Sequence, residues 1–204
     1  MSNLSAYINY FRTLAIMHRD IQHNPGSEVG DAPIESKRFS RWNAEEIIRG
    51  DLRTKMSFSP AALLLELYET DLQAQQLYDI KQFPKGAFTV LCKAEAQDGA
   101  DEERALALAE EIVYHLLQQI WQDHYGAGTS FCSSPFHRFW FDKLQITAVG
   151  PLYGSCFGFR CEFEFEFQQI AKIIDPPPAG IFNNVYLLGG HGFILADSDE
   201  TLGT

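Results

Sequence analysis

The alternation of apolar and polar residues is strongest between residues 157 and 167. Every second position in this stretch is apolar, and these positions hold Phe157, Phe159, Cys161, Phe163, Phe165 and Phe167. The positions between them hold Arg160, Glu162, Glu164 and Glu166. A period of two residues is that of a β-strand and does not fit a helix. The pattern predicts a strand with one face on a core and the other in water or against a partner.

Apolar residues recur at helical spacing in two further segments. In residues 101–124 the apolar residues fall along one face of a helix. The acidic residues at the start, Asp101-Glu102-Glu103, suit the positive end of a helix dipole. Residues 3–22 show a similar periodicity. Both segments are therefore predicted to be helices. A third, short helix is predicted from Asn43, a favourable N-cap, to about Gly50.

Shorter apolar runs predict strands at 62–68, 87–92 and 143–149, the last of them broken by Gly150-Pro151. The polar, Gln-rich residues 72–78 are interpreted as a connection. Near the C-terminus, Gly189-Gly190-His191-Gly192 joins two apolar runs and predicts a hairpin.

These elements predict an α+β fold in which an antiparallel sheet of about four strands packs against one long amphipathic helix. Residues 1–58 are expected to be an N-terminal helical extension and 59–169 the core domain. Residues 170–204 are expected to be a linker rich in proline and an apolar arm. The arm is predicted to contact a neighbouring subunit through five residues, Val185, Tyr186, Leu187, Phe193 and Ile194.

The charge of the chain restricts its partners. Its 27 acidic and 16 basic side chains give a net charge of −11. A field of that sign opposes binding to phosphate backbones and anionic lipid. The first residues lack the pattern of a signal peptide, and no stretch of about 18 residues is continuously apolar. We therefore expect a protein of the cytoplasm, or of a particle assembled there, without a membrane partner.

The carboxylates of the 157–167 strand are a candidate metal site. Glu162, Glu164 and Glu166 fall about 6.5–7 Å apart along one strand face, which is too wide for one ion without other ligands. No metal and no cofactor are expected. We interpret the row as facing solvent, a partner or the lumen of an assembly.

The cysteines and histidines offer weak candidates for catalysis. The four cysteines form no CxxC pair and are expected to be reduced and mostly buried thiols. Cys132 and His137 share a predicted loop and are the candidate nucleophile pair, although their spacing matches no known signature. His115 and His124 are nine residues apart and do not form an HExxH motif. A non-enzymatic role is therefore favoured.

The order of elements between about 59 and 168 resembles that of tail terminator and tail-completion proteins of phages, which also occur in contractile injection systems. Four segments and the helix 101–124 carry the resemblance. The segments are Ala62-Leu63-Leu64-Leu65-Glu66, Lys85-Gly86-Ala87-Phe88-Thr89-Val90-Leu91, Phe141-Asp142-Lys143-Leu144-Gln145-Ile146 and Gly158-Phe159-Arg160-Cys161-Glu162-Phe163.

The resemblance implies a structural virion protein that forms a homo-oligomeric ring, a hexamer, at the end of a tail tube or in the neck. Its partners would be other copies of itself and tail tube, sheath or neck proteins, with DNA only passing through the lumen. Such a protein is cytoplasmic during assembly and part of the virion or tail particle afterwards. Two alternatives stay open: a Cys/His-dependent hydrolase and a monomeric protein-binding adaptor.

Overall fold

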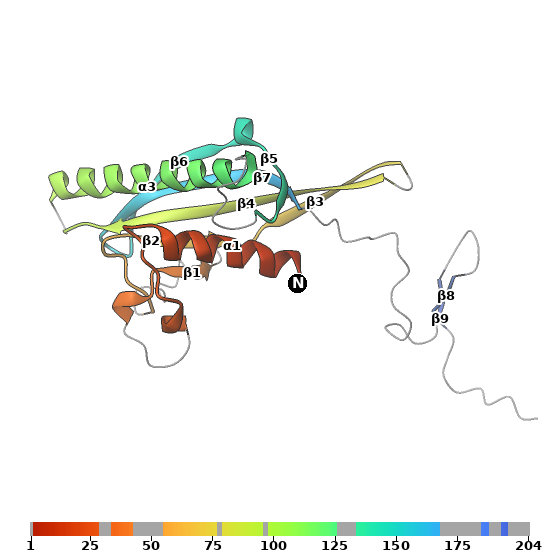
Figure 1. The fold of residues 1–204 in the computed structure, drawn as a ribbon, viewed down its shortest axis with the longest axis horizontal. Coiled ribbons are helices and arrows are strands. Elements are labelled where there is room, and N and C mark those ends of the chain that lie inside the picture. Colours follow the sequence, from red (N-terminus) through yellow and green to blue (C-terminus); the bar gives the residue numbers. More distant parts are fainter. Residues whose placement is uncertain are drawn as a thin grey trace, which may run out of the picture. The chain divides into compact units, whose positions relative to one another are not determined.

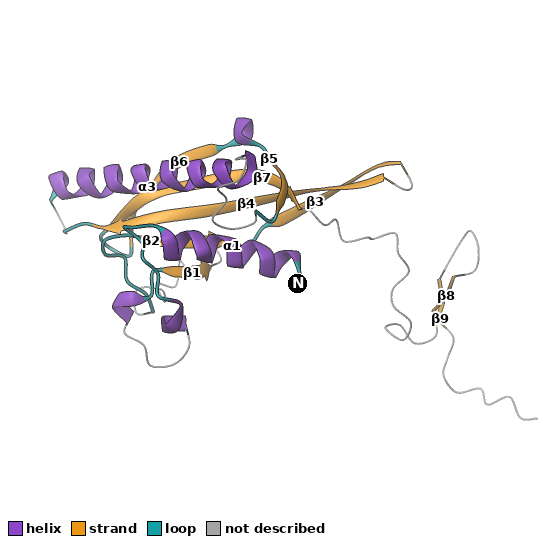
Figure 2. Ribbon diagram, viewed as in Figure 1, coloured by secondary structure: helices purple, strands orange, loops and turns teal. Residues whose placement is uncertain are grey.

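A mixed seven-stranded sheet and two long helices make up the main part of the protein (Figures 1 and 2). The computed structural model describes residues 2–28, 34–42, 55–76, 79–95, 98–125, 134–167, 185–187 and 193–195. The α+β class predicted from the sequence is confirmed. The sheet has more strands than the four that were expected.

The sheet is built around two long strands, β4 (Asp79–Lys93) and β7 (Cys156–Phe167), which pair antiparallel. Successive parts of β4 also pair with β2 (Ala62–Glu66) and β3 (Glu69–Gln76). β5 (Phe136–Phe139) and β6 (Gln145–Leu152) pair with β7. β1 (Phe39–Trp42) runs parallel to β2, and this pair makes the sheet mixed.

Two helices cover one face of this sheet. They are α1 (Asn3–Met17) and α3 (Gly99–Tyr125), and Figure 2 shows both lying along the strands. Tyr10 of α1 bonds Asp123 near the end of α3, whereas Arg19, just after α1, bonds Glu111 nearer its start. The two helices are therefore antiparallel. Residues 1–58, expected as an extension, contribute α1 and β1 to the same unit as the sheet.

The phenylalanine row of β7 forms the centre of the core. Phe163 and Phe165 are almost fully buried, and Phe157 and Phe159 pack against the same cluster with part of their surface exposed. The ring of Tyr7 stacks on that of Phe165 at 5.5 Å between centroids, and Phe11 stacks on Phe163 at 5.6 Å. The predicted core face of this strand is confirmed, and α1 shares it with α3.

A glycine in β4 makes room for these rings. A Cβ at Gly86 would lie 2.6 Å from the Tyr7 hydroxyl and 2.9 Å from the Phe163 ring. With no side chain at this position, the Tyr7 hydroxyl reaches the Glu66 carbonyl and donates a hydrogen bond of 3.1 Å. Burial raises the pKa of Tyr7 well above its usual value, so this phenol stays neutral.

The opposite face of the sheet carries a second, smaller apolar cluster at one end. Side chains from β1, the 55–58 segment, β2, β4 and β7 form it: Trp42, Met56, Phe58, Ala62, Leu64, Leu91 and Cys156. Alternation along β2 explains both clusters, because Leu63 and Leu65 point to the helices while Ala62 and Leu64 point away. The remainder of this face is polar.

One expectation was wrong: most of the 72–78 segment belongs to strand β3, which pairs with β4 from Glu69↔Lys85 to Gln76↔Asp79. β7 pairs with β4 only from Lys85 onward, so residues 70–76 and 79–84 form a ribbon that is two-stranded in the part of the chain that the structure describes. Figure 1 shows this ribbon running out beyond the helices. We call it the β3–β4 arm. Backbone pairing holds it, which explains why its polar side chains gave no strand signal.

Smaller differences concern the ends of elements. α1 ends at Met17 rather than near 22, because His18 is extended, with φ −71° and ψ 126°. β6 continues through Gly150-Pro151 to Leu152, although its register with β7 shifts there. The four-residue strands β1 and β5 were not predicted. The helix expected at 43–50 lies outside the described residues.

Residues 171–204 form a separate unit. Within it, β8 (Val185–Leu187) and β9 (Phe193–Leu195) pair antiparallel, with Val185 opposite Leu195 and Leu187 opposite Phe193. The predicted C-terminal hairpin is confirmed. Its contact with a neighbouring subunit stays a prediction.

Gly158 provides a test of how closely β7 approaches β4. A Cβ there would lie 1.8 Å from the Val90 carbonyl oxygen, which is fixed in the sheet. We expect Gly158→Ala to lower the free energy of unfolding by about 3 kcal/mol, since the two strands must separate to admit the methyl group. Gly99→Ala is the control, because a Cβ at Gly99 meets nothing within 4 Å. Chemical denaturation of both variants measures the difference, and equal stabilities would contradict this packing.

Candidate functional site

The polar face of the sheet holds an ion-pair network centred on Arg160 of β7. Its guanidinium makes a two-pronged contact with the Glu66 carboxylate, with Nε–Oε1 at 2.6 Å and Nη2–Oε2 at 2.9 Å. A third nitrogen, Nη1, pairs with Glu162. Hydrogen bonds to Glu66 raise the pKa of Arg160 further above its usual value. The arginine thereby joins the end of β2 to β7 across β4.

The row of Glu162, Glu164 and Glu166 lies on this face, as the alternation predicted. The Nζ of Lys143 pairs with the Glu164 carboxylate, and Glu166 lies opposite Arg138 of β5 in the strand register. Glu162 and Glu164 therefore have cationic partners within the same chain, Arg160 and Lys143. The row is a partly neutralised network rather than a bare line of negative charge.

A depression of about 360 Å³ lies over this network. Its lining holds four acidic and three basic side chains: Glu66, Glu69, Glu162, Glu164, Lys85, Lys143 and Arg160. The excess is a single negative charge. Three of the carboxylates, those of Glu66, Glu162 and Glu164, are paired with Arg160 or Lys143, so these charged groups serve to lock strands together.

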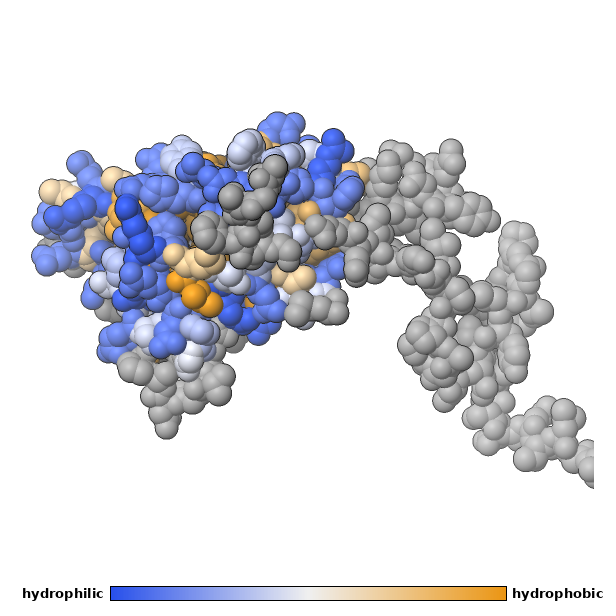
Figure 3. All heavy atoms as spheres, viewed as in Figure 1, coloured by the Kyte–Doolittle hydropathy of each residue, from blue (hydrophilic) through white to orange (hydrophobic). Residues whose placement is uncertain are grey.

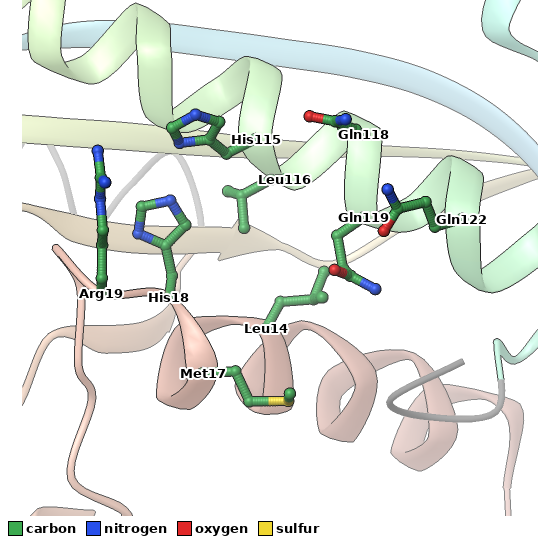
Figure 4. Close-up of a pocket in the computed structure, with 9 residues that line it drawn as sticks. All are labelled: Leu14, Met17, His18, Arg19, His115, Leu116, Gln118, Gln119 and Gln122. Atoms are coloured by element: carbon green, nitrogen blue, oxygen red, sulfur yellow. The ribbon is translucent and has the colours of Figure 1, made fainter. Parts of the chain in front are cut away.

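A larger pocket, of about 540 Å³, lies between α1 and α3 (Figure 4). Leu14 and Leu116 provide apolar surface from the two helices, and three glutamine amides extend from α3 along its rim, Gln118, Gln119 and Gln122. The remaining lining residues are Met17, His18, Arg19 and His115. Tyr10 with Asp123 and Arg19 with Glu111 join the helices on either side. We call this pocket the α1–α3 groove.

The side chains that α3 exposes after Glu111 are all uncharged. They are Tyr114, Gln118, Trp121, Gln122 and Tyr125. Tyr114 and Tyr125 are each 55% exposed and Trp121 52%, although aromatic side chains of this size are usually largely buried. On the helix-covered side of the molecule most of the surface is hydrophilic, and smaller hydrophobic patches lie within it (Figure 3). Exposed aromatic residues beside a groove are typical of protein interfaces.

The groove contains a pair of histidines. The rings of His18 and His115 are 5.6 Å apart and face one another between the helices. The backbone N–H of Asp20 donates to His18 Nδ1 at 3.2 Å. Burial lowers the pKa of His18, so the neutral ring that accepts this bond is the stable form at neutral pH. Sequence spacing did not identify this pair, because its members are 97 positions apart.

The thiols that the structure describes are inert. Cys92, Cys156 and Cys161 are free and buried, as expected for structural thiols. Burial raises the pKa of Cys92 and of Cys161 to about 12, which leaves almost no thiolate at neutral pH. Cys132, half of the candidate Cys–His pair, lies outside the described residues. Its proposed partner His137 is exposed on β5.

Within the described ranges, no three His, Cys, Asp or Glu side chains come together as a metal site. Neither helix in that part of the chain has the length and apolar character needed to cross a membrane.

No family model, no curated protein and no solved structure matches this chain. Function is therefore inferred from the geometry described above.

The Arg160 network predicts a specific loss of stability. We expect Arg160→Met to reduce the free energy of unfolding by about 2 kcal/mol, because Glu66 and Glu162 would lose the guanidinium that both of them bind. The loss should shrink in high salt, which screens their repulsion. The control is Arg104→Met, which removes an exposed arginine from a pair with Asp101 on α3 and should change stability little. Denaturant titration at low and high salt measures both variants.

The groove histidine predicts a pH dependence. Because burial lowers the pKa of folded His18, the unfolded chain binds its proton more tightly. The stability that neutral His18 contributes is complete above its unfolded pKa of about 6.5 and is lost as the pH falls through the lowered folded value. The neighbouring charges of Asp20 and Glu111 oppose this lowering, while those of His115 and Arg19 add to it.

Thermal unfolding between pH 8 and pH 5 should therefore show a melting temperature that falls toward acid. We expect His18→Gln to show a smaller fall. His137→Gln, which changes an exposed histidine on β5, is the control and should keep most of the wild-type dependence. A His18→Gln curve parallel to that of the wild type would contradict the assignment.

Proposed function

We propose that this chain is a structural assembly protein that forms a ring, with about six copies, at the end of a phage-type tail tube or in its neck. The β3–β4 arm is the observation that carries the proposal. Residues 70–76 and 79–84 pair only with each other among the described strands, and a lone two-stranded ribbon is marginally stable in water. A neighbouring subunit would supply the contacts that the arm lacks.

Two further features support assembly. The uncharged aromatic face of α3 offers the side chains that protein interfaces favour. The C-terminal hairpin of β8 and β9 supplies a second apolar element that follows the main unit in sequence. Together they support a protein that makes several contacts with copies of itself and with tail tube, sheath or neck proteins.

The acidic character of the chain suits a ring through which DNA passes. A net charge of −11 repels phosphate and prevents the passing DNA from adhering. Since Arg160 and Lys143 partly neutralise the β7 glutamates, we assign this effect to the acidic surface as a whole and not to that row alone. Such a ring would form in the cytoplasm and remain in the finished particle.

The proposal predicts the mass of the purified protein. Analytical ultracentrifugation and negative-stain images, alone and with the neighbouring tail gene products, should show rings of about six copies. A stable monomer under all of these conditions would favour the adaptor alternative and would contradict the ring.

A substitution at the end of the arm should weaken such rings. We expect Tyr78→Asp to raise the concentration needed for assembly at least about tenfold, since it places a charge in a desolvated contact. Thr70→Asp is the matched control, because it adds the same charge at the exposed base of the arm. Circular dichroism of both variants checks that each is folded. Equal assembly of the two would count against a role for the arm.

A further inference from the structure

We propose that the outer edge of strand β6 pairs with the same edge of a second copy, antiparallel and centred on Thr147. The two copies would then share one continuous sheet, and we call this contact the β6 seam. The inference goes beyond the proposed ring, because a ring of copies arranged head to tail contains no two-fold contact. The seam would join two free copies, or copies that belong to two rings.

β6 lies at the rim of the seven-stranded sheet, on the far side from β1 (Figure 1). It pairs with β7 along one side, and no described strand pairs with it along the other. Five of its eight residues are exposed and none is buried. Every second residue of such a strand turns its backbone N–H and C=O outward, where another extended segment can continue the ladder.

The β6 edge carries no charge, unlike the other strands at the rim of the sheet. β1 holds Arg41, β3 holds Asp71 and β5 holds Arg138. No residue of Gln145–Leu152 has an ionisable side chain. Charged side chains on edge strands commonly prevent pairing between copies, and β6 lacks this protection. In a chain of net charge −11, an uncharged strand can meet its own copy without placing like charges opposite one another.

The strand is complementary to itself in one register. Residues 145–149 pair with β7 without interruption, and the register shifts only after Val149. An antiparallel pairing centred on Thr147 uses all five of these residues in both copies. It places Thr147 opposite the second copy's Thr147, and Ile146 opposite the second copy's Ala148. Pairs of β-branched and apolar side chains stabilise a sheet, whereas a shift by one residue would set the apolar row of one copy against the polar row of the other.

The same pairing would cover apolar surface on the helix side of the sheet. Ile146, Phe157 and Phe159 are only partly buried against the core there. The exposed aromatic face of α3 reaches this edge, because the rings of Tyr125 and Phe141, just before β6, are 6.1 Å apart. A two-fold axis perpendicular to the joined sheet puts α3 of both copies on the same side. The two β7 strands would be three strand spacings apart, about 14 Å, so aromatic side chains of the two helices can approach over the seam.

A disulfide across the two-fold axis tests the register. In a Cys132→Ser background, Thr147→Cys would place two thiols directly opposite one another, with Cα atoms about 4.5–5.5 Å apart, which a disulfide can span. We expect oxidation to give a covalent dimer on a non-reducing gel, at least about ten times more than with Gln145→Cys. Gln145 is also exposed on β6, but two thiols at this position would lie at opposite ends of the seam. The three described native thiols are buried and react slowly.

Sedimentation velocity provides a second measurement without a cross-link. We expect Ala148→Lys to raise the dissociation constant of the dimer at least about tenfold, because it places a charge within the seam. Ala100→Lys makes the same change at an exposed position in the first turn of α3 and should associate like the wild type. Circular dichroism checks that both variants are folded.

The other outcomes separate the seam from the ring. Equal dimer yields from Thr147→Cys and Gln145→Cys, or equal association of the two lysine variants, would refute the β6 seam. Rings of six without the Thr147→Cys disulfide would also refute the seam and leave the proposed function standing. A covalent dimer that never forms rings would support the seam and count against the ring. Monomers without any disulfide would refute both.

Discussion

The packing of the β7 phenylalanines against α1 and α3 is the constraint on which the rest of the structure depends. Phe163 and Phe165 are contacted from α1 by Phe11 and Tyr7, while α3 closes the same cluster. Each buried ring contributes on the order of 1.5–3 kcal/mol, so the row is a main source of stability. It also fixes both helices against one face of the sheet. The groove between the helices and the polar surface on the other side are consequences of that arrangement.

The two sides of the sheet differ in the groups that they expose. On the polar face, Arg160 and Lys143 bind carboxylates of the same chain and leave a nearly balanced set of charges. Such groups hold strands in register and offer little to a partner. On the helix side, the exposed part of α3 after Glu111 is uncharged and aromatic. In an acidic chain, this surface offers a partner exposed side chains that carry no charge.

The sequence predicted elements whose burial is one-sided, and it missed those held by other forces. The β7 alternation and the stripe of α3 are visible because each buries one face, and both were predicted. The polar residues of β3 predict a connection instead, since the pairing of this strand uses backbone groups that no side-chain pattern reports. Arg160 and Glu66 are 94 positions apart, and His18 and His115 are 97 apart, so spacing alone gave no sign of either contact. Periodicity shows which face of a helix is buried but not which helix lies beside it.

In the proposed assembly, contacts between copies would favour surfaces without carboxylates, because each copy carries a net charge of −11. A projecting arm would suit this requirement, because it would keep the two bodies apart. Such an arm costs stability, because among the residues that the structure describes no third strand supports the ribbon. In the proposed assembly the arm would gain its full stability only once the neighbouring subunit is in place.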